Sequence, residues 1–430
     1  MRHRTFHGLR RSTFALLAGL ALLAAACGGD DTADTDTTPT ETETTSTESE
    51  TENETPTEEA GPRTVTVQMD GEVEDSNVAI LGYLPRELTV RQGDTVDFAL
   101  APGDPHTVTF GTLVDDAFEA MANAEEGGPP PPEVQAVPQA FTPEGQVVPT
   151  GMVPCFSDSP PDDGSPCEQI EQPDFSGELA FYNSGGLAEP GATFTVPIAE
   201  DAAPGTYNYF CLIHGPDMSG TLTVVGADES APTPEEVEQQ REETLDALIE
   251  EAQPALDATS QGTQPGFEEA YPEGGDATVL AGGGAQPQGF IFDILTFGPD
   301  EVEIEAGQTV RWNIFGFHTI SFNAPQDATP FVIQGDDGLP TVNELAVTPQ
   351  GGAAGMPPPP EGGGGGGDAP PEATVVDGGA WDGQGFFSSG LFVSFPPGLF
   401  SYDITFETPG TYTYQCLIHP GMEGTVNVTG

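Results

Sequence analysis

Six histidines and five cysteines occur in the 430 residues, and the spacing of some of them suggests a metal site. Beyond residue 26 only four histidines remain, and two of these follow a cysteine by three residues and precede a methionine. The two segments are Cys211-Leu-Ile-His214-Gly-Pro-Asp-Met218 and Cys416-Leu-Ile-His419-Pro-Gly-Met422. Two imidazoles, a thiolate and a weakly bound thioether are the ligands of a type 1 (blue) copper centre. Each segment would supply all of these except the second imidazole.

Upstream histidines could complete both sets. His106 and His318 each follow a pair of expected strands, about a hundred residues before the cysteine. Taken singly, a methionine is more often part of a core than a ligand, and a cysteine is more often an inert buried thiol. The repetition of the whole pattern favours copper over these simpler interpretations.

The chain around these residues contains an internal repeat. Residues 87–100 match residues 301–314 when Gly93 is aligned with Gly307. In both stretches apolar and polar side chains alternate, which is typical of half-buried strands joined by a glycine turn. The sequence therefore predicts that each histidine follows two strands with a glycine turn between them.

The repeat continues at the other end of each unit. Residues 204–214 match residues 409–419, and Ser184-Gly185 and Ser389-Gly390 each place their glycine 26 residues before the cysteine. We therefore expect an all-β chain with two tandem domains, each a sandwich of short strands. Their expected bounds are 63–226 and 275–430.

Each repeat resembles a cupredoxin of the plastocyanin/azurin family, and the short loop from Cys416 to Met422 is similar to that of amicyanin. The resemblance covers two blocks per repeat. It implies two tandem cupredoxin-like Greek-key β-sandwiches with long loop insertions, joined by a partly helical linker. It also implies two type 1 copper ions, one in each domain.

The resemblance implies a ligand set for each copper. His106, Cys211, His214 and Met218 would hold one ion, and His318, Cys416, His419 and Met422 would hold the other. In that family the later histidine lies near the surface in an apolar patch and passes electrons to partners. His214 and His419 would have this role, with Leu212, Ile213, Leu417 and Ile418 as neighbours.

Both repeats depart from the family between the upstream histidine and the cysteine. This interval is 105 residues in the first repeat and 98 in the second, which is far longer than in small cupredoxins. Proline- and glycine-rich runs at 127–132 and 356–367 predict that parts of the insertions are disordered. The insertions could cover the copper, bind a partner, or be solvated segments without a specific role.

The linker at 227–274 contains one helical pattern. Thr233 suits the N-cap position, Pro234 the first helical position, and two glutamates follow. Apolar residues then recur near one face, and Pro254 is expected to end the helix. We expect this short helix to pack on one domain or to separate the two.

The N-terminus has the pattern of an export signal. Basic residues precede a short apolar run and three alanines, so residues 1–26 are predicted to be a signal peptide. Cys27 follows and resembles the lipidated cysteine of a bacterial lipobox; ordinary cleavage that leaves a spare thiol is the alternative. Residues 27–62 are then expected to be a disordered acidic tether. The predicted location is extracytoplasmic, anchored to the cell membrane as a lipoprotein.

Cys155 and Cys167 flank a polar, proline-rich segment of the first insertion. In an oxidising compartment this pair is expected to form a local disulfide. A second metal site is the alternative, but no histidine lies nearby in the sequence.

The charge excludes some partners. Seventy acidic residues oppose nine basic ones, all arginine, which gives a net charge of −61. Such a surface repels phosphate backbones and anionic headgroups, so we expect no nucleic-acid binding and membrane contact through a lipid anchor only. A redox protein that docks here should be basic, or should meet the chain at high salt.

Three functions remain compatible with these features. One-electron transfer between redox partners is the leading prediction, and copper storage or delivery is the alternative that the sequence cannot separate from it. A two-domain copper oxidase or nitrite reductase needs further histidines for its catalytic copper. All four histidines beyond residue 26 are used by the two type 1 sites, so we expect no catalytic residues and no enzyme.

Overall fold

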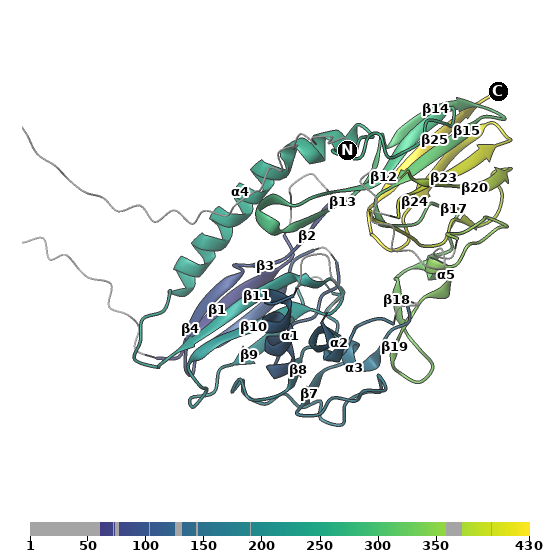
Figure 1. The fold of residues 1–430 in the computed structure, drawn as a ribbon. Helices are drawn as coiled ribbons and strands as arrows, with labels where there is room; N and C mark the ends of the chain where they lie inside the picture. Colours follow the sequence, from purple (N-terminus) through teal and green to yellow (C-terminus); the bar gives the residue numbers. More distant parts are fainter. Residues whose placement is uncertain are drawn as a thin grey trace, which may run out of the picture. The chain divides into compact units, whose positions relative to one another are not determined.

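The fold was analysed in a computed structural model that describes residues 61–71, 73, 77–102, 104–124, 131–142, 145–189, 191–357, 372–396 and 398–430 (Figure 1). Strands dominate this part of the chain, and they form two sandwiches in sequence order. The expected all-β fold with two tandem sandwiches is confirmed.

The first sandwich consists of a four-stranded sheet, in the order β3–β1–β5–β9, and a six-stranded sheet, in the order β4–β11–β10–β6–β8–β7. Its strands are β1 (Thr64–Met69), β3 (Tyr83–Leu84), β4 (Glu87–Arg91), β5 (Thr95–Leu100), β6 (Thr109–Phe110), β7 (Cys155–Ser157), β8 (Phe181–Asn183), β9 (Thr193–Pro197), β10 (Gly205–Cys211) and β11 (Gly215–Val225).

The second sandwich repeats this plan. A six-stranded sheet has the order β2–β13–β12–β15–β23–β20, and a five-stranded sheet has the order β14–β25–β24–β17–β21. Its strands, with two small pairs (β16–β22 and β18–β19), are β2 (Val78–Leu81), β12 (Ala277–Ala285), β13 (Ile291–Gly298), β14 (Glu301–Glu305), β15 (Thr309–Ile314), β16 (Gly316–His318), β17 (Ser321–Phe322), β18 (Val332–Gln334), β19 (Pro340–Val342), β20 (Thr374–Trp381), β21 (Phe387–Ser388), β22 (Phe392–Ser394), β23 (Phe400–Phe406), β24 (Gly410–Gln415) and β25 (Glu423–Thr429).

The alternation seen in the sequence is the alternation of burial. In β5 every second residue is buried, so that Val96, Phe98 and Leu100 enter the core between the sheets. In β15 the residues Val310, Trp312 and Ile314 do the same. Both sandwiches therefore close over an aromatic-rich core, and the cysteines and methionines of the two repeated loops lie at its edge.

One strand crosses between the sandwiches. β2 belongs to the first repeat, but it pairs antiparallel with β13, with Ile80 opposite Phe292 and Val78 opposite Ile294. The first repeat therefore completes a sheet of the second. The sequence predicted two tandem units and did not reveal this exchange, because an alternating strand does not specify its partner.

Helix α4 (Pro234–Ser260) begins as predicted, with a capping box formed by Thr233 and Glu236. The prediction that it ends at Pro254 was wrong, because the helix continues through this proline to Ser260 and is not short. Leu248 and Leu256 lie on either side of Pro254 and are buried with Ile80 and Phe292, so tertiary packing holds the turn that proline weakens. The helix thus contacts strands of both sandwiches (Figure 1).

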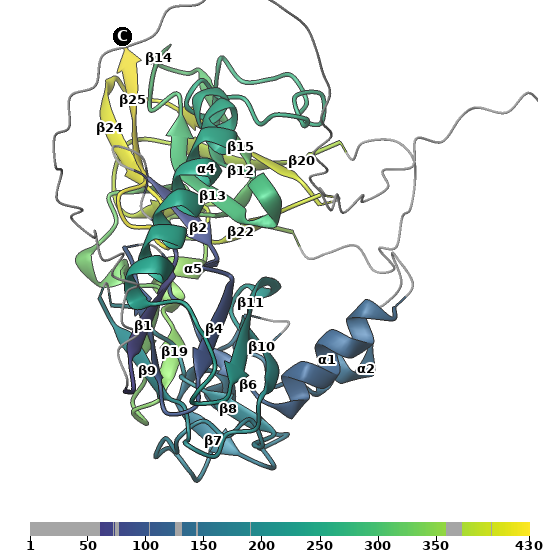
Figure 2. The same cartoon turned by 90° about the vertical axis from the view of Figure 1, so that its left-hand side faces the viewer.

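The long insertions contain ordered structure. The first has three helices, and the second has one helix and a 3₁₀ turn; a further 3₁₀ turn lies in the hairpin between β12 and β13. Figure 2 shows α1 and α2 of the first insertion and α5 of the second, whose bounds follow. These elements are α1 (Thr112–Ala122), α2 (Pro132–Ala136), α3 (Pro149–Met152), α5 (Glu344–Val347), η2 (Gln326–Ala328) and η1 (Pro287–Gly289). The proline- and glycine-rich runs predicted to be disordered lie largely outside the described residues.

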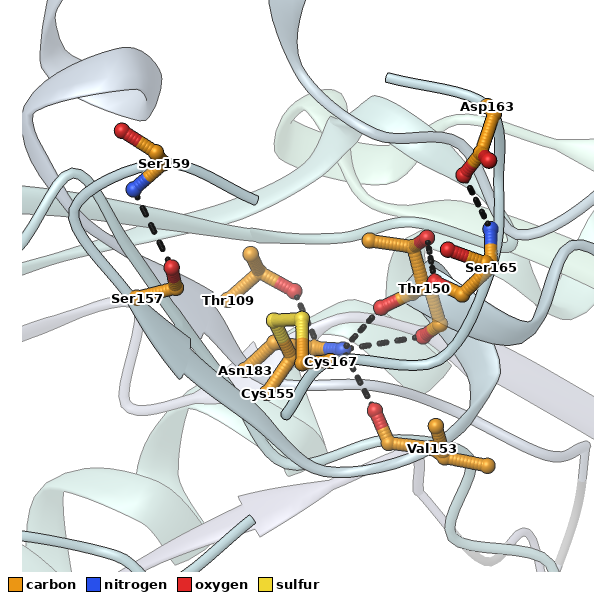
Figure 3. Close-up of a disulfide and its surroundings, with 11 residues drawn as sticks. Thr109, Thr150, Val153, Cys155, Ser157, Ser159, Asp163, Ser165, Cys167 and Asn183 are labelled. Carbon is orange, nitrogen blue, oxygen red and sulfur yellow. Dashed lines mark hydrogen bonds between the residues drawn. A yellow bond between two sulfur atoms is a disulfide. The ribbon is translucent and has the colours of Figure 1, made fainter. Parts of the chain in front are cut away.

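A disulfide joins Cys155 and Cys167 in the first insertion, with a Cα–Cα distance of 5.4 Å (Figure 3). Beside it the Asn183 amide donates hydrogen bonds to backbone carbonyls of the α3 segment, including that of Gly151 at 3.0 Å. The Thr109 hydroxyl donates to the carbonyl oxygen of the same amide. The first insertion is therefore attached to the edge of the six-stranded sheet of the first sandwich.

Within the described residues, no helix is long and apolar enough to cross a membrane. The predicted signal peptide (1–26), the predicted lipidation site Cys27 and nearly all of the predicted tether (27–62) lie outside these residues.

Candidate metal centres

The first candidate centre is built from the end of one hairpin and one loop. Cys211 is the last residue of β10, and His214 lies in the turn before β11. His106 lies in the loop after β5, where its backbone pairs with Leu187. The hydrogen-bond register between β10 and β11 shifts between Phe210 and Cys211.

The three donor atoms of this centre face one another. The Nδ1 atoms of His106 and His214 are 3.1 Å apart, and they lie 3.8 and 3.5 Å from Sγ of Cys211. The point in their plane that is equidistant from all three atoms lies about 2.0 Å from each, which is the bond length of zinc to histidine nitrogen. A metal ion therefore fits between the two nitrogen atoms, and its longer bond to sulfur, about 2.3 Å for zinc, requires a shift of only a few tenths of an ångström.

The second candidate centre has the same construction. The Nδ1 atoms of His318 and His419 are 3.1 Å apart, and they lie 4.0 and 3.7 Å from Sγ of Cys416. The equidistant point here lies about 2.1 Å from each atom, again the length of a metal–ligand bond. The structure therefore brings six of the eight proposed copper ligands together as two separate triangles.

The two methionines are buried beside these triangles. Met218 belongs to the same core cluster as Cys211, and Met422 to the same cluster as Cys416; both are at most 1% exposed. The loop that carries Met422 is closed by hydrogen bonds between the backbones of Cys416 and Met422, and of Met422 and His419. A buried thioether in the same cluster could serve as the weak fourth donor of a copper ion.

Two threonines that the sequence analysis did not single out hold the cysteines. The backbone N–H of Thr107 donates to Sγ of Cys211 at 3.3 Å, and that of Thr319 donates to Sγ of Cys416 at 3.4 Å. Their hydroxyls accept from the next backbone N–H after each cysteine, both at 2.8 Å. The signal was present in the sequence, because a threonine follows the upstream histidine in both repeats.

The repeated Ser-Gly pairs hold the strand that follows the upstream histidine. The hydroxyl of Ser184 accepts from the N–H of Val108 at 2.8 Å, and that of Ser389 accepts from the N–H of Ile320 at 2.9 Å. Equal spacing before the cysteine therefore has a structural cause, because the serine must reach the same strand in both sandwiches.

The two upstream histidines are held differently. Nε2 of His106 lies 3.1 Å from the carboxylate of Asp70, whereas Nε2 of His318 lies 3.0 Å from the carbonyl oxygen of Phe315. Asp70 comes directly after Met69, which pairs with Leu100. Gly282 comes directly after Ala281, which pairs with Ile314, the equivalent of Leu100 in the second repeat. The same position thus carries a carboxylate in the first centre and a glycine in the second.

Electrostatics favours the thiolate form in both centres. Burial raises the pKa of Cys211, but the charge of His214 and hydrogen bonds with His106 and His214 outweigh it, so the pKa lies well below the ordinary value. The pKa of Cys416 is lowered in the same way, mainly by His419 against the effect of burial. A thiolate is the form that binds a metal ion.

The pKa values of the two upstream histidines differ because their hydrogen-bond partners differ. Burial lowers the pKa of His106, but Asp70 and the Cys211 thiolate together raise it to about 10. For His318, burial prevails over nearby Asp293 and lowers the pKa. The two centres are therefore not electrostatic copies of each other.

The observed surroundings of the later histidines differ from the predicted apolar surface patch. His214 is partly exposed, whereas His419 is only 5% exposed, so little of its side chain reaches solvent. Leu212 and Leu417 are also buried, because each insertion packs over the leucine that follows the cysteine. Ile213 and Ile418 are partly buried.

The comparisons with known proteins give no family by sequence. No protein-family model matches the chain, and no curated protein matches it. Among solved structures, the chain is similar to cupredoxins. A reduced auracyanin from Roseiflexus castenholzii is 19% identical, with a TM-score of 0.20 over 38% of this chain and 98% of its own.

Two further solved structures show the extent of this similarity. An amicyanin mutant in its reduced state is 15% identical, with a TM-score of 0.19 over 38% of this chain and 82% of its own. A mutant fern plastocyanin is 18% identical, with a TM-score of 0.19 over 37% of this chain and all of its own. Each match spans most of a small protein and just over a third of this chain.

Proposed function

We propose that the protein transfers single electrons through two type 1 copper centres, one in each sandwich. The observation that carries the proposal is the pair of buried triangles of two Nδ1 atoms and one Sγ atom, each with room for one metal ion. Histidine, histidine, cysteine and a distant methionine form a donor set that suits copper in this role.

When bound, copper would supply a couple that exchanges one electron without breaking a bond. The protein's own residues would keep the structural change that accompanies this exchange small. Thr107 and Thr319 fix the sulfur atoms through backbone N–H groups, and hydrogen bonding around the cysteine sulfur tunes the potential of such centres. The buried ligands would reorganise little between the two oxidation states.

Export and tethering form part of the proposal. They are supported by the N-terminal sequence, in which a basic and apolar signal precedes Cys27. A lipid on Cys27 would hold the two sandwiches outside the cell membrane, at the end of an acidic tether.

The partner would dock near His214. This residue is the more exposed of the two later histidines, and acidic Asp217 beside it is also exposed. Because the chain carries a net charge of −61, we propose a redox protein with a basic docking face, or one that meets the chain at high salt. Electron exchange with a cationic complex should therefore slow as salt is added, whereas exchange with an anionic complex should become faster.

Copper titration with single-site variants tests this function. The full chain should bind two copper ions, become intensely blue and be reduced reversibly. Cys211→Ser and Cys416→Ser, made separately, should each remove about half of the colour and leave the other centre reducible. A colourless protein would contradict the proposal, and copper that binds without reversible reduction would favour storage or delivery instead. Turnover of oxygen or nitrite by the purified protein would indicate an enzyme.

A further inference from the structure

A third group of metal-binding side chains lies between the two sandwiches. Asp104 from the loop after β5, Asp293 from β13 and His419 from the loop after β24 place their donor atoms within 4.8 Å of one another. Asp104 is 8% exposed and His419 is 5% exposed. Both sandwiches therefore contribute to one small, mostly buried group of two carboxylates and an imidazole.

The Nε2 of His419 has no hydrogen-bond partner among the described residues; when Nδ1 binds copper, a second ion at Nε2 would displace the ring proton to solvent and leave a bridging imidazolate. Nδ1 of His419 faces Cys416 and His318, while its Nε2 lies 4.0 Å from Oδ1 of Asp104. This distance is too long for a hydrogen bond. It is within twice the length of about 2.0–2.2 Å that zinc forms to histidine nitrogen and carboxylate oxygen, so one ion could contact both atoms.

Few charged partners surround the carboxylates at this position. Among the described residues, no hydrogen bond is donated to the side chain of Asp104, whose Oδ1 lies 4.0 Å from Nε2 of His419, and Asp293 forms no ion pair. Asp70 accepts the N–H of Asp104 at 3.0 Å and adds a third carboxylate nearby, although it is itself paired with His106. A buried cluster of this kind is stabilised when it binds a cation.

We propose that a divalent first-row ion of the zinc class binds here, held by the carboxylates of Asp104 and Asp293 and by Nε2 of His419. It would clamp the two sandwiches together at the joint made by β2 and β13. The donor set distinguishes the ion, because imidazole suits zinc and copper(II), whereas calcium and magnesium prefer oxygen atoms alone. This site does not require the proposed copper centres, although it shares His419 with one of them.

The internal repeat explains why the site would occur once. Ala79 lies opposite Asp293 across the β2–β13 pair, and Gly316 stands two residues before His318 as Asp104 stands two residues before His106. The carboxylates therefore have no counterpart on the other side of the joint, near His214. One ion per chain is expected.

Zinc binding to the copper-loaded full chain tests the proposal. We would add ZnCl₂ in high NaCl with an excess of CaCl₂, which occupies ordinary acidic surface sites, and count the zinc retained after gel filtration. Copper should stay in its own sites, because its affinity exceeds that of zinc. We expect one retained zinc ion, and zinc X-ray absorption should show one imidazole among its ligands.

Asp104→Asn and Asp293→Asn should each lower the zinc affinity by about tenfold or more, the range found when a ligand environment is disturbed. Asp228→Asn changes an exposed aspartate and should leave the affinity unchanged. Blue colour retained by the variants would show that they fold. Zinc that calcium displaces, zinc bound equally well by both variants, or an absorption spectrum without imidazole would each overturn the site.

The outcome does not depend on copper binding. A protein that stays colourless would contradict the proposed electron transfer; its empty triangles could then bind zinc, so the zinc assay would be made in a background that combines Cys211→Ser and Cys416→Ser and would be read by the same aspartate variants. Conversely, a blue protein with two copper ions and no retained zinc would contradict this site alone.

Discussion

Gly282 determines how closely the chain can approach His318. A Cβ atom at this position would overlap Nε2 of His318 and the carbonyl oxygen of Phe315, and the residue has a φ of +77°. We therefore expect Gly282→Ala to displace His318, to weaken copper binding at the second centre by on the order of 10–100-fold, and to leave the first centre unchanged. Copper titration in a Cys211→Ser background measures the second centre alone.

Gly307→Ala is the matched control for this substitution. Gly307 has a similar φ of +91°, but a Cβ atom there would have no neighbour within 4 Å. This variant should lose about 1–2 kcal/mol of stability from backbone strain and keep its copper affinity. Equal losses of copper in the two variants would mean that strain, rather than contact with His318, is the cause.

Asp70 is expected to set the potential of the first centre. A carboxylate that accepts from the second nitrogen of a ligand histidine makes that ligand more basic, which favours the higher oxidation state of the metal. Asp70→Asn should therefore raise the reduction potential of the first centre. A rise on the order of 60 mV would correspond to a tenfold change in the ratio of the two oxidation states.

Spectroelectrochemistry in a Cys416→Ser background would measure this shift without interference from the second centre. The wild-type first centre should also have a lower potential than the second, where the carbonyl of Phe315 replaces the carboxylate. An unchanged or lowered potential in Asp70→Asn would contradict this role of Asp70.

The ligand triangles could be predicted at the residue scale because their spacing is local and repeated. Cys211 and His214 share one turn, and so do Cys416 and His419, so sequence distance alone brings them together. The third group could not be predicted, because Asp104, Asp293 and His419 meet only through tertiary contacts. In addition, each imidazole has two nitrogen atoms, so a histidine that binds one ion through Nδ1 can still contribute to a second site through Nε2.

Among the elements, α4 and β2 hold the joint between the sandwiches. Leu248 of α4 is fully buried with Ile80 of β2 and Phe292 of β13. Leu248→Ala should cost about 2–5 kcal/mol, the range for removing a buried leucine side chain. Because its contacts belong to both sandwiches, the colour of both centres should be lost at the same, lower urea concentration.

Glu250→Ala serves as the control on the same helix. Glu250 is exposed, so its removal should change the stability by less than about 0.5 kcal/mol. If Leu248→Ala separated the loss of colour into two steps, the two sandwiches would be unfolding independently, and the shared joint would not govern their stability.

The strands themselves could be predicted from alternation, since Val96 and Phe98 point inward as their spacing requires. The end of α4 could not, because proline removes one hydrogen bond and local sequence does not reveal what packing replaces it. The partner of β2 was equally hidden, because it depends on a surface more than two hundred residues away.

In the whole molecule the joint has an approximate twofold symmetry. β2 and β13 occupy equivalent positions in the two repeats and pair with each other. Val78 and Ile80 lie opposite Ile294 and Phe292, and the Ala79–Asp293 pair lies between them. Symmetric pairing of this kind is usual between the subunits of a dimer. Here it is made within one chain, and this places both metal triangles in the neighbourhood of the same acidic joint.

The high charge of the molecule should make its stability depend on salt. With 70 acidic and nine basic residues, repulsion opposes the folded state, and salt screens it. For a unit of this size, each kcal/mol of screened repulsion should raise the Tm by about 1–2 °C. Calorimetry in NaCl measures this, and most of the rise should come between about 0.01 and 0.15 M, where the screening length falls from about 30 to 8 Å. A Tm that rises only at molar salt would point to general salting-out instead.

The strand exchanged at the joint also has a consequence for the order of synthesis. β2 emerges from the ribosome early, but β13, its partner, follows about 210 residues later, which at 5–20 residues per second means a delay of about 10–40 s. During that time an apolar strand edge, all of whose residues are buried in the finished protein, remains without its partner. A nascent chain in this state is exposed to mispairing with other chains. We therefore expect the yield of folded protein to fall when expression is fast, and to recover when a chaperone shields the first half until the second is complete.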